Sequence, residues 1–348
     1  MSASASSNAL HAAIRRLAGG ESLTADETAD AFDVVMQGEA TPAQVAALLV
    51  GLRVKGETAA EVAGGARALR RAMITMPARD PGQLVDTCGT GGGKVTTFNI
   101  STAAAFVAAG AGARVAKHGN RSFTSRCGSA DVLEALGVRI DVSVEQMAAT
   151  LESAGIVFMF APLMHPAMRH VGPVRREIAI PTVMNILGPL ANPAGAGRQV
   201  IGVADANRAP LLAEALAELG STRALVVHGE PGLDEVSPMG VTRLIEVGEG
   251  RTSEWTIDPR DFGYGGATAE DLAGGDPADN ARIIVEILRG ERHGGARAAA
   301  VLNAAAAIYV AGLASDYGDA VSIGERSIDN GAAWSALERL RSATAVSM

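Results

Sequence analysis

The middle of the chain alternates between short apolar runs and longer helical patterns, and this alternation constrains the fold most strongly. The apolar runs read as buried strands and cover residues 84–87, 113–116, 156–160, 200–204 and 224–227. Helical patterns lie between them, for example at 130–136, 144–152 and 210–219. Strands that alternate with helices in this way are typical of parallel βαβ units. The sequence therefore predicts an α/β fold with a mostly parallel sheet.

Three capping boxes predict a small helical domain before this alternation. In each box a threonine is followed three residues later by Glu or Gln: Thr24 and Glu27, Thr41 and Gln44, Thr58 and Glu61. The two side chains of such a pair satisfy free backbone N–H groups at a helix start. Each box also opens a run of apolar residues at helical spacing. We therefore expect a helical domain over 1–79 and a larger α/β domain over 80–348.

A proline-rich stretch at 165–195 interrupts the alternation. It contains five prolines, and we read it as a short helix over 167–177 followed by irregular backbone. We expect this stretch, called the return segment below, to cross back to the helical domain, which would then be discontinuous in sequence. The last part of the chain is again helical, with patterns at 281–288, 296–311 and 327–341.

The composition excludes several classes of protein. The chain has 348 residues, of which 48% are hydrophobic and 20% charged, so it is too apolar and too weakly charged to be disordered. Its formal net charge of −8 counts against nucleic-acid binding and against an anionic membrane surface. Cys88 and Cys127 lack the spacing of a zinc site and suit a reducing compartment. No apolar run approaches the roughly 18 residues that span a bilayer. We therefore predict a cytoplasmic protein without membrane contact.

A glycine-rich loop follows the strand predicted at 84–87. Its glycines are Gly89, Gly91, Gly92 and Gly93. Glycines after a strand let backbone N–H groups approach an anion closely. The loop is not a Walker loop, because Cys88 stands where the first glycine would be and Val95 follows Lys94 where Ser or Thr is needed. We interpret it as a phosphate loop, with a flexible turn as the alternative.

Two further polar stretches follow in the chain. Ser101 and Thr102 precede an apolar helical run, and we expect Ser101 to cap that helix, whose start carries partial positive charge. Charged and polar residues then surround Gly119 at the end of the strand at 113–116. Ligands of parallel α/β sheets bind at this edge. These stretches predict a site for two phosphate groups, with a solvated loop as the alternative.

The motifs in this region resemble those of the anthranilate phosphoribosyltransferase family. They are GTGG at 89–92, NIST at 99–102, KHGNR at 117–121 and GSAD at 128–131. The similarity continues in the same order through HPAMRHVGPVRR at 165–176, NILGPLANP at 185–193 and GLDEV at 232–236. It covers nearly the whole chain. The resemblance implies a small helical domain, a larger α/β domain with the active site between them, and a homodimer.

The resemblance also implies an activity and its site residues. The family transfers the 5-phosphoribosyl group of phosphoribosyl pyrophosphate (PRPP) to the amino group of anthranilate, with Mg²⁺, in the second step of tryptophan biosynthesis. The implied PRPP site comprises Gly89, Gly92, Gly93, Thr97, Asn99, Ile100, Ser101, Thr102, Lys117, His118, Gly119, Asn120, Arg121, Ser122, Phe123, Thr124, Ser125 and Ser129. The implied anthranilate contacts are Gly89, Asn120 and Arg175, and the implied metal ligands are Ser101, Asp234 and Glu235. No residue is implied as a nucleophile or base; Lys117 and Mg²⁺ would stabilise charge.

One departure from the family pattern keeps alternatives open. The family usually has Asp and then Gly after GTGG, where this chain has Gly93 and Lys94. We hypothesise that Lys94 replaces part of the neutralising role of the metal. A pyrimidine nucleoside phosphorylase shares the fold and a lysine in the glycine-rich loop, and a non-enzymatic relative that binds nucleic acid is a second alternative. The motif at 117–121, Arg175 and the acidic residues at 234–235 favour the transferase.

Overall fold

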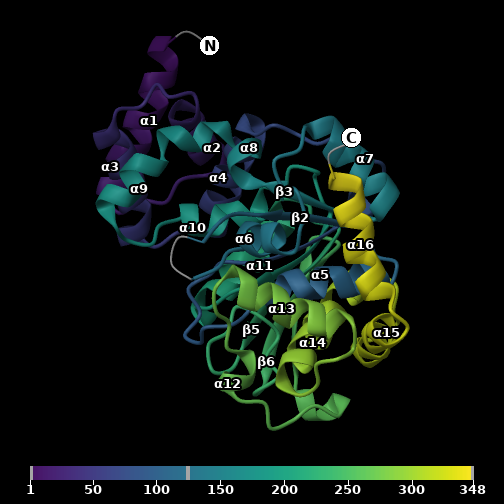
Figure 1. The fold of residues 1–348 in the computed structure, drawn as a ribbon. Helices are drawn as coiled ribbons and strands as arrows, with labels where there is room; N and C mark the ends of the chain where they lie inside the picture. The colour runs from purple at the N-terminus through teal and green to yellow at the C-terminus, as the bar shows by residue number, and fades with distance from the viewer. Residues whose placement is uncertain (1–2, 123–125, 346–348) are drawn as a thin grey trace.

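A seven-stranded sheet organises the larger part of the molecule (Figure 1). The structure is a computed structural model that describes residues 3–122 and 126–345. The strand order is β3-β2-β1-β4-β5-β6-β7. The strands are β1 Val85–Gly89, β2 Val115–Gly119, β3 Ile156–Phe160, β4 Arg198–Gly202, β5 Arg223–Gly229, β6 Thr242–Gly248 and β7 Arg251–Ile257. Strands β1 to β5 pair in parallel, which confirms the predicted fold class.

The sequence analysis missed the last two strands, which form an antiparallel hairpin at one edge. The hairpin turns at Glu249 and Gly250, whose φ angles of 52° and 71° are both positive. Two-residue hairpin turns of this kind favour Asn or Asp before Gly. Because Glu takes the first position here, the sequence signal for the hairpin is weak.

Helices cover both faces of the sheet. The helices of this domain are α5 Ile100–Gly110, α6 Ser129–Ala135, α7 Val144–Ala154, α11 Ala209–Glu218, α12 Ala269–Leu272, α13 Pro277–Leu288, α14 Gly295–Ala311, α15 Tyr317–Asp329 and α16 Ala332–Thr344. Leu225 and Val227 of β5 belong to the core that contains α5 and α14, whereas Ala224 and Val226 belong to the core that contains α11. Alternate residues of a strand thus serve the two opposite layers.

The helix predicted over 327–341 is wrong in its bounds. Helix α15 ends at Asp329 and α16 begins at Ala332. Gly331 between them has a φ angle of 78°, which L-residues rarely adopt. The apolar positions keep helical spacing on both sides of this break, so the periodicity alone did not reveal it.

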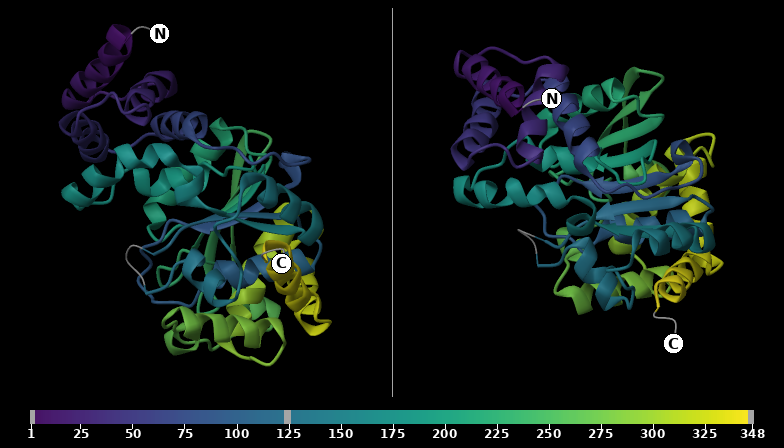
Figure 2. Two further views of the ribbon diagram at one scale, coloured as in Figure 1. Left: turned by 45° about the horizontal axis from the view of Figure 1, so that its top comes forward. Right: turned by 90° about the horizontal axis from the view of Figure 1, so that it is seen from above.

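Four helices form a bundle at the N-terminal end of the chain, drawn in purple in Figure 2. They are α1 Ala3–Ala18, α2 Ala25–Met36, α3 Pro42–Lys55 and α4 Ala59–Ala72. The three predicted capping boxes are confirmed at the starts of α2, α3 and α4, with both reciprocal hydrogen bonds in each. No helix in the described ranges is long and apolar enough to cross a membrane.

The return segment lies beside this bundle (Figure 2). Its elements are the 3₁₀ turns η2 Pro166–His170 and η3 Gly188–Leu190 and the helices α9 Gly172–Ile178 and α10 Met184–Leu187; α8 Ala161–Met164 precedes it. The helix predicted over 167–177 is therefore broken, because η2 and α9 meet at Val171. η2 contacts α2, α9 contacts α3 and α10 contacts α4. The apolar core of the bundle also continues into α11 of the α/β domain.

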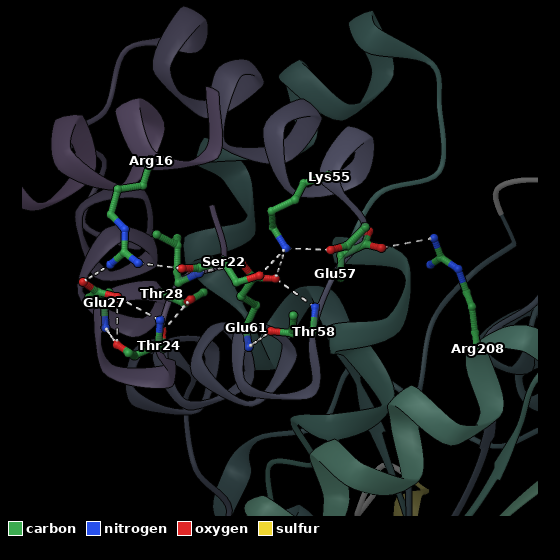
Figure 3. Close-up of polar contacts among 12 residues, drawn as sticks. Arg16, Ser22, Thr24, Glu27, Thr28, Lys55, Glu57, Thr58, Glu61 and Arg208 are labelled. Carbon is green, nitrogen blue, oxygen red and sulfur yellow. Dashed lines mark hydrogen bonds and ion pairs between the residues drawn. The ribbon is translucent and has the colours of Figure 1, made fainter. Parts of the chain in front are cut away.

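A buried ion pair fixes the turn between α3 and α4 (Figure 3). The Glu61 side chain is 0% exposed and lies 2.9 Å from the ammonium of Lys55, which is 8% exposed. Its carboxylate also accepts the N–H groups of Leu23 at 2.9 Å and Thr58 at 2.8 Å. Glu61 therefore joins three segments of the bundle, beyond its part in the capping box. Glu27 has the same place in the α2 box, but it lies at the surface with Arg16.

We expect Glu61→Gln to lower the free energy of unfolding by about 3 kcal/mol or more, because the buried Lys55 charge loses its partner. Glu27→Gln is the matched control, since it changes the same position of an exposed capping box. Its effect should stay below about 1 kcal/mol. Urea unfolding of the two variants and the wild type measures both values. Equal losses would contradict a special role for the buried pair.

Candidate active site

The carboxyl ends of β1 and β2 bring a buried lysine to the glycine-rich loop. Lys117 is only 4% exposed. Its ammonium donates to the carbonyl oxygen of Thr87, and it lies 3.3 Å from both the Thr87 and the Ser101 hydroxyl oxygens. Strand β2 is the parallel neighbour of β1, so the carboxyl ends of both strands lie at the same edge of the sheet. The predicted residues Lys117 and Ser101 therefore meet there.

Ser101 does not cap helix α5, contrary to our expectation. The helix begins at Ile100, and Asn99 takes the capping position without a capping hydrogen bond from its side chain. The Asn99 side chain instead donates to the carbonyl of Cys127 at 3.2 Å and accepts from Asn280 at 2.9 Å. Ser101 lies in the first turn, where its backbone N–H points to Glu235. Its hydroxyl thereby stays available beside Lys117.

The acidic pair, Asp234 and Glu235, reaches both phosphate-binding elements predicted above. Asp234 Oδ2 accepts the backbone N–H of Gly91 at 2.8 Å. Glu235 Oε1 accepts the N–H of Ser101 at 3.2 Å. The loop that carries the pair passes over the end of β4, where a Cβ atom on Gly202 would lie 1.7 Å from the Asp234 carbonyl oxygen. Glycine at position 202 is therefore a condition for this arrangement.

The two half-buried residues place their carboxyl groups near each other and partly away from water, which disfavours their charged forms. Burial and the charge of Asp234 raise the pKa of Glu235 to about 8. Burial also raises the pKa of Asp234. The described ranges contain no group of three or more His, Cys, Asp or Glu residues that could hold a metal ion. The donors at this place are two carboxylates and the Ser101 hydroxyl, which are all oxygen ligands.

Two histidines, the half-buried His118 and the buried His165, face each other beside the 117–121 loop. The sequence analysis assigned a role to His118 but none to His165. The rings of His118 and His165 lie 4.9 Å apart between centroids. Burial lowers the pKa of His118 to about 3 and that of His165 to about 4, so both are neutral near pH 7. Among the described residues, Nε2 of His118 and both ring nitrogens of His165 have no hydrogen-bond partner. The placement of His165 directly before Pro166 was too common a pattern to single it out.

The predicted cations differ in their surroundings. Arg121 is paired with Asp131 at 2.7 Å and with Glu134 at 2.6 Å, so carboxylates of α6 already neutralise its charge. Arg175 lies on α9, where burial lowers the pKa of its guanidinium. Within the described part of the chain, that guanidinium has no ion pair. Lys94 is exposed, and its backbone N–H donates to the Gly232 carbonyl at 3.1 Å.

The other predicted residues lie at several places along the chain. Gly89 is the last residue of β1, and Gly92, Gly93 and Thr97 lie between β1 and α5. Ile100 and Thr102 are buried in α5, which leaves only their backbone near the loop. Gly119 packs so closely that a Cβ atom there would lie 2.2 Å from the Ser129 hydroxyl oxygen, and this hydroxyl donates to the Asn120 carbonyl at 3.3 Å. The Ser122 N–H lies 3.3 Å from Asp131. Phe123, Thr124 and Ser125 lie outside the described residues.

Comparison with known proteins places this site in a family. Residues 81–334 match the α/β domain of the glycosyl transferase family, and residues 11–73 match its helical bundle domain. The anthranilate phosphoribosyltransferase of Rubrobacter xylanophilus is 53% identical over 330 residues, which are 95% of this chain and 96% of that protein. The enzyme of Herpetosiphon aurantiacus is 52% identical over 91% of this chain and 94% of its own length.

Solved structures give the same result. The crystal structure of anthranilate phosphoribosyltransferase from Thermus thermophilus has a TM-score of 0.90 at 42% identity, covering 95% of this chain and 99% of that one. The Saccharomyces cerevisiae enzyme in complex with PRPP and Mg has a TM-score of 0.86 at 29% identity, with 96% and 97% covered. With both domains matched and such identity over nearly the full length, this chain belongs to the anthranilate phosphoribosyltransferase family.

Proposed function

We propose that this chain transfers the 5-phosphoribosyl group from PRPP to the amino group of anthranilate and releases pyrophosphate, the second step of tryptophan biosynthesis. The observation that carries the proposal is the meeting of Lys117, Ser101 and the acidic pair at the glycine-rich loop. A related yeast structure was solved with PRPP and Mg, and another with 4-fluoroanthranilate, which supports both substrates. The protein would act as a cytoplasmic homodimer.

The PRPP half of the site is proposed to lie between the glycine-rich loop, the start of α5 and the 117–121 loop. Backbone N–H groups at a helix start and in a glycine-rich turn bind phosphate oxygens well. The buried ammonium of Lys117 adds a full positive charge to these partial charges. The N–H groups of Gly91 and Ser101 are bonded to the acidic pair in this structure, so phosphate binding there would exchange those hydrogen bonds.

The metal half is proposed to be Asp234, Glu235 and Ser101. Their donors fit Mg²⁺, which is a hard cation that prefers oxygen ligands and substrate phosphates. The raised pKa of Glu235 supports the fit, because the negative charge of Asp234 disfavours a second negative charge beside it. A cation bound between the two carboxylates would remove that repulsion. When bound, Mg²⁺ would neutralise charge on the departing pyrophosphate.

The anthranilate half is proposed to include Arg175, Asn120 and Gly89. The half-buried guanidinium of Arg175 would bind the anthranilate carboxylate by charge-assisted hydrogen bonds. The neutral rings of His118 and His165 would offer hydrogen-bonding nitrogens without adding charge near the aromatic amine. We propose that the return segment, with residues 1–79, forms the helical domain and contributes Arg175, whereas Asn120 and Gly89 come from the α/β domain.

The reaction would be a displacement at C1 of the ribose. The amine of anthranilate is neutral near pH 7, so it attacks without a strong base, and the transition state would resemble an oxocarbenium ion. Neither cysteine suits a covalent intermediate: burial raises the pKa of both the Cys88 and the Cys127 thiols. The protein would therefore act by positioning and by charge stabilisation, with Lys117 as the fixed cation.

The assay that tests the proposal follows anthranilate fluorescence after PRPP and Mg²⁺ are added to the protein. We expect the fluorescence to fall with time, and EDTA to stop the decay. A folded protein with excess Mg²⁺ that leaves anthranilate unchanged would contradict the proposal. Phosphorolysis of a pyrimidine nucleoside would then test the phosphorylase alternative, and a gel shift with single-stranded DNA the nucleic-acid-binding alternative.

Replacing Arg175 should weaken anthranilate binding specifically. We expect Arg175→Gln to raise the KM for anthranilate about tenfold or more, because a charge-assisted hydrogen bond to the carboxylate is lost. The KM for PRPP should stay within about threefold. Arg176→Gln is the matched control, since Arg176 is the exposed neighbour on the same short helix. Steady-state kinetics with each substrate varied measures both constants; similar changes in the two variants would count against the assignment.

Lys94 should lower the requirement for Mg²⁺. It stands one position after Gly93, and a Cβ atom at Gly93 would lie 3.2 Å from Asp234 Oδ1. We expect Lys94→Ala to shift the Mg²⁺ optimum to higher concentration and to raise the KM for PRPP, because a cation near the pyrophosphate is removed. A Mg²⁺ titration at fixed substrates compares the variant with the wild type. Identical optima and KM values would refute the role of Lys94.

A further inference from the structure

A buried carboxylate lies inside β1, and none of the proposed roles above uses it. Asp86 is 0% exposed. One of its oxygens accepts the backbone N–H of His118 at 3.1 Å, and the other accepts the side-chain amide of Asn192 at 2.8 Å. Burial raises the pKa of Asp86, while the charge of Lys117 and these hydrogen bonds oppose that effect. Since both of these partners donate, the carboxylate serves as an acceptor.

Asn192 is the second member of this buried contact, and its amide is fully used. The side chain is 4% exposed. Its Nδ2 donates to Asp86 and to the carbonyl of Ala116, both at 2.8 Å. Its Oδ1 accepts the N–H groups of Ala194 at 2.9 Å and Ala196 at 3.4 Å. A side chain without both donors and an acceptor would leave buried polar groups unpaired at this position.

The two residues connect parts of the chain that come from different places. Asp86 holds the 117–121 loop through the backbone of His118. Asn192 belongs to the return segment, which also contains His165 and Arg175 and contacts helices of the bundle. One carboxylate is therefore bonded to both parts of the chain that form the proposed anthranilate half of the site.

We propose that Asp86 and Asn192 are positioning residues for anthranilate: the pair keeps the 117–121 loop at a fixed separation from the return segment that bears Arg175. The inference rests on the proposed function, because it deepens the assignment of the anthranilate half. A displacement of about 1 Å between reacting groups can reduce a rate about a hundredfold, so such a link affects the reaction without touching the substrate. The pair does not reach the acidic pair or the glycine-rich loop by any hydrogen bond in the described residues.

Three variants test the pair. Asp86→Asn and Asn192→Asp each replace one member by a side chain of nearly the same shape. Asp86→Asn leaves one contact with two donors, whereas Asn192→Asp leaves acceptors facing each other at Asp86 and at the Ala116 carbonyl. The double variant, with both replacements, places one amide against one carboxylate again. Gln199→Met is the matched control: Gln199 lies opposite Asp86 on β4, is 1% exposed, and donates to the Pro189 carbonyl of the return segment at 2.8 Å.

The kinetic result expected is a split between the two substrates. For each single variant, kcat/KM for anthranilate should fall about tenfold to a hundredfold. The KM for PRPP should stay within about threefold in Asn192→Asp, which keeps the Asp86 carboxylate near Lys117. Asp86→Asn removes that charge and should raise the KM for PRPP as well, by a smaller factor than the loss for anthranilate. The double variant should regain at least about tenfold over the weaker single variant, because the amide–carboxylate contact is restored. The kcat/KM of Gln199→Met for anthranilate should stay within about fivefold of the wild type. This variant removes the hydrogen bond to Pro189 of the return segment but leaves the bond between Asp86 and His118.

A second readout does not depend on the activity. Hydrogen exchange should be faster at the His118 amide in both single variants, and it should keep wild-type protection in Gln199→Met. If the wild type transfers no phosphoribosyl group, the proposed function fails, yet this measurement still shows whether the pair holds the loop. Single variants that do not fold, beside a folded and active double variant, would support the pair.

Four results would overturn the proposal. The first is a kcat/KM for anthranilate within about threefold of the wild type in the single variants, and the second is an equal rise in both KM values. The third is a double variant that is no better than the single variants, or unfolded like them. The fourth is a Gln199→Met variant as impaired as Asp86→Asn. The last result would show that any loss of a hold on the return segment has the same effect. Unchanged exchange at the His118 amide would remove the structural basis.

Discussion

The buried ammonium of Lys117 is the charge on which the arrangement of the site depends. It lies in β2, bonded to Thr87 and Ser101, and Asp86 and Glu235 are the two carboxylates whose charges act on it. Burial alone lowers the pKa of this lysine, and the two carboxylates oppose that effect. A buried charge persists only when partners compensate for the lost hydration. The acids and the lysine are therefore mutually dependent, although they come from three separate strands or loops.

Close backbone contacts make this concentration of charge possible. The loop with the acidic pair crosses β4 at Gly202 and approaches β5 at Gly229, where a Cβ atom would lie 2.5 Å from the Glu235 carbonyl oxygen. Gly89 similarly leaves room for the Asp234 carboxylate, at 2.5 Å from the Cβ position. Glycine is required at these positions because a side chain would push the two acidic residues away from Lys117 and from the start of α5.

Much of this could be predicted from the sequence, because local patterns carried it. The capping boxes at Thr24, Thr41 and Thr58 depend on residues three apart, and the strand ends near Gly89 and Gly119 were marked by glycine. What could not be predicted depends on distant partners. Asn99 rather than Ser101 takes the capping position of α5, and the Asn99 side chain bonds to Asn280 far along the chain. The pairings of His118 with His165 and of Asp86 with Asn192 likewise join residues whose sequence neighbours give no hint of contact.

The hydrogen bonds of the acidic pair help to explain the effect of Gly93 and Lys94, which stand where the family usually has Asp and Gly. Asp234 and Glu235 accept the N–H groups of Gly91 and Ser101, so in the proposed site each carboxylate takes a position that a phosphate oxygen would occupy. For phosphate to bind there, a cation that accompanies the substrate would have to draw both carboxylates away from these N–H donors. A third carboxylate at position 93 would add to the negative charge that has to be neutralised. In the proposed site, glycine there, followed by an exposed lysine, would shift the balance in the other direction, because less of the neutralisation would then rest on bound metal.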